Sequence, residues 1–130
     1  MTRTAISLAA LLGLAASVAL AETPIKESES APGKILTDTS GMTLYTFDKD
    51  QGGMSACYDD CAKAWPPLLA AADAVPDDKD FGIVERTDGT KQWTFYGKPL
   101  YLWMQDKAPG DVTGDGVKGV WHAAEATGEE

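Results

Sequence analysis

The sequence Gly41-Met-Thr-Leu-Tyr-Thr-Phe-Asp-Lys-Asp50 recurs fifty-six residues later as Gly97-Lys-Pro-Leu-Tyr-Leu-Trp-Met-Gln-Asp106. Glycine, Leu-Tyr, an aromatic residue and aspartate occupy the same positions in both copies. The same offset relates Trp65 to Trp121, so each copy is followed by a loop and a tryptophan. Matching positions at one fixed offset indicate an internal repeat, and we therefore predict two related halves.

Each copy of the repeat has the period of a β-strand. Tyr45 and Phe47 are two positions apart in the first copy, and Tyr101 and Trp103 are their equivalents in the second. Side chains two positions apart face the same side of a strand. Aromatic and β-branched residues also favour a pleated, half-buried surface. We expect one strand in each half, with its aromatic residues on one face.

An aspartate follows each predicted strand, Asp50 in the first copy and Asp106 in the second. Two roles are open to these side chains: they cap the following loop by accepting backbone N–H bonds, or they act as ligands. Aspartate is a routine loop former, which favours capping. A catalytic site built on these two carboxylates is the weaker hypothesis.

The ends of the sequence differ in character from the repeat. Arg3 is the only charge in the first twenty-one residues, which contain an Ala/Leu-rich run and end in Ala19-Leu20-Ala21. These features are typical of a signal peptide cleaved after Ala21 and predict a periplasmic or secreted protein without a stable membrane anchor. The predicted divisions are a signal peptide over 1–21, a flexible linker over 22–34, one domain over 35–124 with repeats at 35–68 and 81–124, and a disordered tail over 125–130.

The chain is acidic, with a formal net charge of −9 that becomes −10 when the signal segment and its single arginine are removed. Such a surface repels the phosphates of nucleic acids and anionic lipids, which argues against both as partners. A protein partner or a homodimer remains open, and the ligand is unknown.

Local patterns predict a mostly β (small α+β) fold of antiparallel strands with one short helix. Pro66 and Pro67 must end the helix. The expected elements are a hairpin of strands 34–38 and 43–47, a helix over 56–64 with Ser55 as N-cap, a surface crossover over 69–80, strands 81–87 and 90–96 joined by a two-residue Asp88-Gly89 turn, a third meander strand over 100–103, and a last strand over 120–123.

Several linked motifs carry a family resemblance. They are Leu44-Tyr45-x-Phe47-x-x-Asp50, Ser55-x-Cys57-x-x-x-Cys61-Ala62-x-x-Trp65-Pro66-Pro67-Leu68, Gly97-Lys98-Pro99-Leu100-Tyr101-x-Trp103-x-x-Asp106, and Pro109-Gly110-Asp111 leading to Gly116-Val117-x-Gly119-Val120-Trp121. From about Ile35 to Ala123 the chain resembles a bacterial family of secreted-repeat, predicted lipoproteins, named for a Tyr-x-(Phe/Trp/Tyr)-x-x-Asp motif. The resemblance implies an exported domain and no transferable activity. Many members look lipidated, whereas this sequence lacks a lipobox cysteine.

Cys57 and Cys61 are the only cysteines. An even pair in an exported chain usually becomes a disulfide, which is the role we predict. The alternative is redox exchange or soft-metal binding through the Cys-x-x-x-Cys spacing.

His122 is the only histidine, and Met104 is one of the few methionines. Together with Cys57 and Cys61 they form a soft-ligand set suited to copper or haem. A lone histidine is more often a hydrogen-bonded surface residue, and the sequence has no Cys-x-x-Cys-His motif for covalent haem. We therefore predict no cofactor and keep copper or haem as the alternative.

Two further patterns have a structural and a functional interpretation. Asp111 to Gly116 imitates the first half of a calcium loop, but His122 stands where a bidentate glutamate is needed, so a Gly/Asp turn is favoured. The aromatic residues form either the core of a small domain or a stacking platform for a flat ligand, and the core is favoured. They are Tyr45, Phe47, Trp65, Trp93, Tyr96, Tyr101, Trp103 and Trp121.

The sequence contains no Ser-His-Asp arrangement in a nucleophile-elbow context, no phosphate loop and no defined carboxylate pair. We therefore predict an exported, non-catalytic binding or accessory domain. The alternative is a periplasmic redox or metal carrier that uses Cys57, Cys61 and His122.

Overall fold

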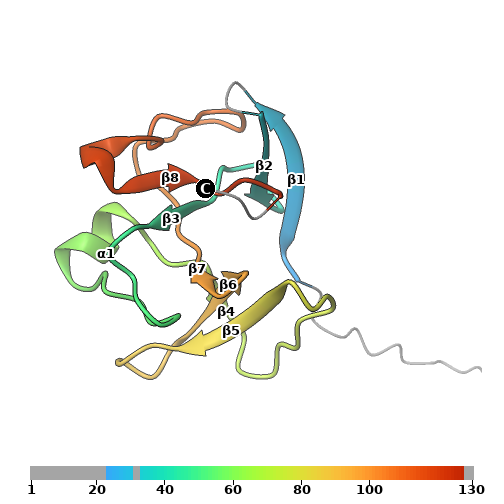
Figure 1. Cartoon of the computed structure of the whole chain (residues 1–130), viewed down its shortest axis with the longest axis vertical. Helices are drawn as coiled ribbons and strands as arrows, with labels where there is room; N and C mark the ends of the chain where they lie inside the picture. Colours follow the sequence, from blue (N-terminus) through green and yellow to red (C-terminus); the bar gives the residue numbers. More distant parts are fainter. Residues whose placement is uncertain (1–22, 31–32, 128–130) are drawn as a thin grey trace, which may run out of the picture.

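Short antiparallel strands and long loops make up the computed structural model, which describes residues 23–30 and 33–127 (Figure 1). The predicted signal peptide and the end of the predicted tail, 128–130, lie outside the described residues. Among the described residues no helix is long and apolar enough to cross a membrane. In chain order the elements are β1 (Ile25–Ser30), β2 (Gly33–Asp38), β3 (Tyr45–Phe47), α1 (Asp60–Ala64), β4 (Leu69–Ala70), β5 (Phe81–Glu85), β6 (Lys91–Phe95), β7 (Lys98–Pro99), the 3₁₀ helix η1 (Val117–Gly119) and β8 (Trp121–Ala123). The predicted mostly β fold class is confirmed.

The two halves of the chain meet at Tyr45 and Tyr101. The Tyr45 N–H donates to the Tyr101 carbonyl over 2.8 Å, and the Tyr101 N–H donates back to the Tyr45 carbonyl over 2.9 Å. On its other edge Tyr45 lies opposite Ala123, and Tyr101 lies opposite Pro67. Pro67 and Ala123 are again fifty-six residues apart. The repeat therefore folds with an approximate twofold axis that passes between the two tyrosines.

Alternation along the repeat separates the buried side chains of the described residues into two clusters. Tyr45 and Tyr101 belong to one cluster, together with the disulfide-bonded Cys57. Their neighbours Leu44 and Leu100 point to the opposite face and belong to the other cluster. The four repeat residues are fully buried. The predicted period of two thus places tyrosine on one side of the central strands and leucine on the other.

In the second half β6 pairs with β4, β5 and β7 (Figure 1). The β5–β6 pair was predicted, but the third strand is β7 at Lys98–Pro99, where a turn was expected, and β4 lies in the segment 69–80 predicted as a surface crossover. The two-residue turn predicted between β5 and β6 is wrong. The Arg86 N–H donates to the Thr90 carbonyl over 2.7 Å, and the Gly89 N–H donates to the Arg86 carbonyl over 2.9 Å. Of the three enclosed residues only Gly89 has a positive φ, 89°. The loop is a three-residue hairpin loop, because glycine adopts the left-handed conformation that closes it.

The segment predicted as a linker, 22–34, contains a strand in the structure. β1 pairs antiparallel with β2 along its whole length (Figure 1). Its side chains are mostly polar and exposed, so the sequence carries no hydrophobic signal for it. Backbone pairing to an available strand edge needs no such signal. The predicted tail is also too long, because the Ala126 N–H donates to the Lys34 carbonyl over 3.0 Å.

The predicted helix is present but shorter than expected, because α1 begins at Asp60 rather than at Ala56. Ser55 does not cap it. The Ser55 hydroxyl instead pairs with the Tyr101 hydroxyl over 2.7 Å and accepts the Cys57 N–H over 3.1 Å. The helix cannot begin earlier, because Asp59 has φ 55° and ψ −122°, which is not a helical conformation.

Two predicted strands are also reduced. β3 starts only at Tyr45, and the opening hairpin keeps a single bridge between Thr37 and Thr43. In place of a strand over 100–103, the structure has isolated bridges of Tyr101. These shorter strands leave room for the loops that carry the remaining repeat residues.

Candidate functional site

The tyrosines and aspartates of the repeat bond across the two halves. The Tyr45 hydroxyl donates to Asp106 Oδ2 over 2.6 Å, and the Tyr101 hydroxyl donates to Asp50 Oδ2 over 2.7 Å. The other oxygen of Asp106 accepts the Thr113 N–H at 3.0 Å and the Thr113 hydroxyl at 2.6 Å. Each tyrosine thus reaches the aspartate of the other copy, a partner that lies far away in the sequence.

Both aspartates also hold a loop, as the capping interpretation expects. Asp50 Oδ1 accepts the Ala56 N–H over 2.7 Å, and Asp106 accepts the Thr113 N–H. A carboxylate that accepts backbone N–H groups satisfies donors that a loop would otherwise leave unpaired. The carboxylate oxygens are therefore used by the chain itself.

Burial sets the protonation of this network. It raises the pKa of the Tyr45 and Tyr101 hydroxyls above the usual value, and the bonded carboxylates act in the same direction. Burial also raises the pKa of Asp50, while the hydrogen bonds from Tyr101 and Ala56 and the nearby Arg86 oppose that rise. The tyrosines consequently remain neutral donors, a state that suits a structural bond better than proton transfer.

Arg86 completes the network and was not anticipated from the sequence. Its side chain is almost fully buried, although it lies beside a turn at the end of a strand. One guanidinium nitrogen donates to Ser55 Oγ over 3.1 Å and to Gln92 Oε1 over 2.8 Å, and another donates to the Cys57 carbonyl over 2.8 Å. No local pattern distinguishes such an arginine from an exposed one, because Ser55 and Cys57 lie 31 and 29 residues away in the sequence.

Four aromatic rings form a continuous stack, which we call the aromatic stack. Trp121 lies on Phe47 with ring centroids 4.0 Å apart and on Trp65 with centroids 3.8 Å apart. Trp65 in turn lies 3.8 Å from Trp103. The two inner rings, Trp65 and Trp121, are equivalent in the repeat, and so are the two outer rings. The stack therefore follows the same approximate twofold axis as the backbone.

A groove of about 430 Å³, which we call the stack groove, runs beside these rings and is lined by all four. Its other apolar lining comes in two equivalent pairs, Cys61 with Val117 and Ala64 with Val120. The first member of each pair belongs to α1, and the second belongs to the turn that contains η1. Figure 1 shows α1 and this turn near one end of the β3–β8 pair. Symmetry-related segments of both halves thus form one apolar depression.

Three charged side chains complete the lining of the stack groove. Lys49, Asp60 and Lys118 contribute to it and are exposed. Asp60 is within 3.7 Å of Lys63 on the same helix. The groove therefore combines an apolar interior with two lysines and one carboxylate.

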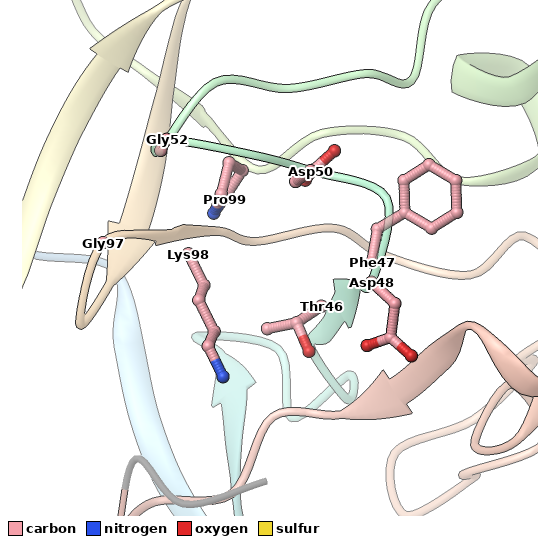
Figure 2. A pocket seen from close by; sticks show the side chains of 9 residues that line it. Thr46, Phe47, Asp48, Asp50, Gly52, Gly97, Lys98 and Pro99 are labelled. Atoms are coloured by element: carbon pink, nitrogen blue, oxygen red, sulfur yellow. The ribbon is translucent and has the colours of Figure 1, made fainter.

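A second region lies on the other side of β3. Figure 2 shows a cavity of about 230 Å³ between β3 and β7, in which the side chains of Thr46, Asp48 and Lys98 extend to one side and Phe47 to the other. A neighbouring cavity of about 550 Å³ shares Asp48 and Lys98 and includes His122. His122 Nε2 lies 2.8 Å from Asp48 Oδ2. This region is polar and of mixed charge.

The ligand set of the carrier hypothesis is not brought together. Cys57 and Cys61 are joined in the predicted disulfide, with Cα atoms 5.2 Å apart. Cys61 lines the stack groove, whereas His122 lines the polar region and Met104 lines neither. Within 23–30 and 33–127 no group of three or more His, Cys, Asp or Glu side chains has a spacing suited to a metal ion.

The calcium-like segment uses its oxygens for turns. Asp111 Oδ2 accepts the N–H groups of Lys107 and Ala108, and Asp115 Oδ1 accepts the N–H of Ala123. These bonds agree with the Gly/Asp turn that was favoured for this segment.

Comparison with known proteins identifies the repeat directly. A family described as a secreted repeat of unknown function matches residues 27–69 and 82–125. The two matched segments contain the two repeat copies, each with its tryptophan. No curated protein and no solved structure matches the chain significantly.

Proposed function

The chain belongs to the family described as a secreted repeat of unknown function, and we propose that it is an exported, non-catalytic binding domain whose ligand occupies the stack groove. The observation that supports this function is the construction of the groove from equivalent residues of both halves. A ligand in this position would contact both repeats at once.

The chemistry of the groove favours binding. Phe47, Trp103, Val117 and Val120 are only partly buried, so the groove leaves apolar surface in contact with water. Covering such surface contributes about 25 cal/mol for each Å² removed from water. Concave, mainly apolar depressions with a few polar groups are the usual form of ligand sites.

The ionisable groups with shifted pKa values do not suggest catalysis. Tyr45 and Tyr101 are hydrogen-bonded to Asp106 and Asp50 of the opposite repeat, and none of these residues lines the stack groove. Asp50 lines the smaller cavity between β3 and β7, but its two carboxylate oxygens already accept bonds from Tyr101 and Ala56. A catalytic acid or base needs a shifted pKa and also a position within reach of a substrate. Burial of these groups inside the fold explains their raised pKa values without a reaction.

Export agrees with the family description and with the disulfide, which persists in oxidising compartments. We include in the proposal the signal peptide over 1–21 with cleavage after Ala21. Intact mass measurement of protein purified from a bacterial periplasm should give a chain that starts at Glu22. A mature chain that retains Met1 would contradict this part of the proposal.

NMR of the indole N–H groups tests the groove as a binding site. Trp65, Trp103 and Trp121 line the groove, whereas Trp93 is buried in the other core cluster and serves as an internal control. Titration with a set of flat aromatic fragments should shift the first three resonances and leave the resonance of Trp93 unchanged.

A pair of matched variants makes the assignment specific. Val120→Glu introduces a carboxylate into the groove and should abolish the shifts, whereas Val75→Glu changes an exposed valine that does not line the groove and should preserve them. Binding that survives Val120→Glu, or shifts that appear mainly at Trp93, would refute the groove as the site.

A further inference from the structure

The groove presents the edges of its central rings rather than their faces. Trp65 is covered on its two faces by Trp121 and Trp103, and Trp121 is covered by Trp65 and Phe47. Trp65 is 4% exposed and Trp121 3%, so only a narrow strip of their ring edges reaches the groove, between the more exposed Phe47 and Trp103. Aromatic edges carry partial positive charge and attract the negative face of another ring. A flat aromatic group lying along this wall would make edge-to-face contacts with successive rings.

The number of stacked rings also sets the length of the aromatic side of the groove, which we call the wall. Three successive centroid spacings of 4.0, 3.8 and 3.8 Å separate Phe47 from Trp103. A fused two- or three-ring system is shorter than this span and would cover part of the wall. A saturated ring offers no π-face for the positive edges, so the wall favours a planar conjugated group over an aliphatic one.

The charged part of the groove lining selects the sign of the ligand. Lys49 and Lys118 both line the groove, although the chain as a whole carries a net charge of −9. Within the described part of the chain neither lysine has an ion-pair partner, whereas Asp60 is close to Lys63. The groove therefore offers two lysines without ion-pair partners among the described residues, beside the carboxylate of Asp60, on a protein of net negative charge.

These lysines are not required by the repeat. The positions equivalent to Lys49 and Lys118 hold Gln105 and Ala62, so the other half builds the same backbone with uncharged residues. Lys118 also adopts φ 53° and ψ 15°, a left-handed conformation that is uncommon outside glycine. The apolar residues of the groove are related by the twofold axis, whereas its two lysines are not. A ligand that uses both would have a flat apolar ring system and one charged substituent.

We infer that the stack groove binds a planar aromatic molecule that carries a carboxylate, with its ring system along the tryptophan edges and its carboxylate near Lys49 and Lys118. This inference rests on the proposed function and specifies the class of ligand. The probes that test it are 2-naphthoate, its neutral isostere 2-naphthamide and the cation 2-naphthylmethylammonium. Cyclohexanecarboxylate tests the need for a flat ring.

Titrations followed by the indole N–H resonances should rank 2-naphthoate above 2-naphthamide by roughly three- to tenfold, as expected for two exposed charge contacts. The cation should bind more weakly than either, and cyclohexanecarboxylate should bind weakest among the anions. Added salt should reduce the affinity for 2-naphthoate and leave that for 2-naphthamide nearly unchanged.

The lysines are tested with the double variant Lys49→Gln/Lys118→Gln. It should bind the acid and the amide equally, while Lys26→Gln, an exposed lysine on β1, should keep the wild-type preference. Both changes are on the surface, and unfolding curves check that the variants remain folded. A preference for the acid that survives the double variant would overturn the assignment of the lysines.

The other outcomes separate this inference from the proposed function. Equal binding of acid and amide to the wild-type protein would overturn the anionic preference and leave the groove as a binding site. Tighter binding of the cation would overturn it as well. Failure of every probe would overturn both proposals, and groove resonances that shift on dilution alone would assign the groove to a second copy of the chain.

Discussion

Tyr45 and Tyr101 exchange both of their backbone hydrogen bonds, and their hydroxyls reach the aspartate of the opposite repeat. The two copies of the repeat therefore do not fold as independent halves. Each copy supplies the donor for a carboxylate in the other, so the two copies form a single core. A ligand in the stack groove would rest on the same shared structure.

Removal of one motif hydroxyl should destabilise the fold, and unequally in the two halves. Tyr45→Phe takes a donor from the buried Asp106 and an acceptor from the Gly114 N–H, and should lower the free energy of unfolding by about 2–3 kcal/mol. Tyr101→Phe removes bonds to Asp50 and Ser55 and should lower it by about 1–2 kcal/mol, because Asp50 is less buried than Asp106 and Ser55 Oγ keeps its bonds from the Cys57 N–H and Arg86. Urea unfolding measures both, with the exposed Tyr96→Phe as control. No loss in either variant would contradict the reciprocal network, and equal losses would contradict the argument from burial.

Alkaline pH should destabilise the protein through the same tyrosines. Burial raises the folded-state pKa of Tyr45 and Tyr101 above the unfolded value of 10.0. The native state therefore holds protons that the unfolded state releases, so this stability is complete below about pH 10 and is lost as the pH rises above it.

The expected slope is up to about 1.4 kcal/mol per pH unit for each tyrosine. Urea midpoints measured from pH 9 upward should show it, and each single Tyr→Phe variant should have a shallower slope than the wild-type protein. Lysines titrate equally in the wild-type protein and in the variants, so their contribution cancels when the slopes are compared. Identical slopes in the wild-type protein and the variants would show that the two hydroxyls ionise normally in the folded state.

A methyl group at Gly114 should disturb the aromatic stack. A Cβ there would lie 2.7 Å from Trp65 Cη2 and 3.0 Å from Trp103 Cδ1, closer than atoms in contact approach. Gly114→Ala should therefore lower the free energy of unfolding by about 1–3 kcal/mol. It should also change the near-ultraviolet circular dichroism of the stacked tryptophans. An unaltered spectrum with unaltered stability would mean that the rings are not packed against this glycine.

Arg86 should not be replaceable by lysine. Its planar guanidinium donates to Ser55, Gln92 and the Cys57 carbonyl at once, which a single ammonium group cannot reproduce. Arg86→Lys keeps the charge and should still lower the free energy of unfolding by about 2–4 kcal/mol. The exposed Lys107→Gln provides a control within about 0.5 kcal/mol of the wild type. A loss for Arg86→Lys as small as that control would show that charge alone is sufficient.

The disulfide should give a modest stabilisation, because Cys57 and Cys61 enclose only a short loop. The chain-entropy model gives about 2 kcal/mol for such a loop. The double variant Cys57→Ala/Cys61→Ala should lose about this amount, and it should remain folded because the cross-repeat bonds of Tyr45 and Tyr101 are retained. Complete unfolding of the variant would show that the disulfide organises the core itself.

Much of the architecture was predictable because it depends on local patterns. The fixed offset between Tyr45 and Tyr101 predicted two related halves, and the even cysteine pair predicted the disulfide. Alternation predicted the pairing of β5 with β6 and the last strand, because side-chain period two is a local property. The strand over 25–30 escaped prediction, since its polar residues pair through the backbone alone.

Most of the candidate site was not predictable. Trp65 and Trp121 were favoured as core residues, but the sequence has no information on the order in which rings stack. Arg86 had no signal, because its burial depends on Ser55 and Cys57 from a distant segment and on Gln92 from the next strand. Cys61 and Val117 occupy equivalent repeat positions, but the sequence does not indicate that both line one groove.

The sequence by itself determined that this chain is a repeat of alternating strands with a disulfide-forming cysteine pair. Only the tertiary structure decided that Tyr45 bonds to Asp106, sixty-one residues away, and that Phe47, Trp121, Trp65 and Trp103 stack in that order. The physical reason is that strand alternation and turns depend on neighbouring residues. The pairing of the two halves depends instead on packing between segments that meet only when the whole chain has folded.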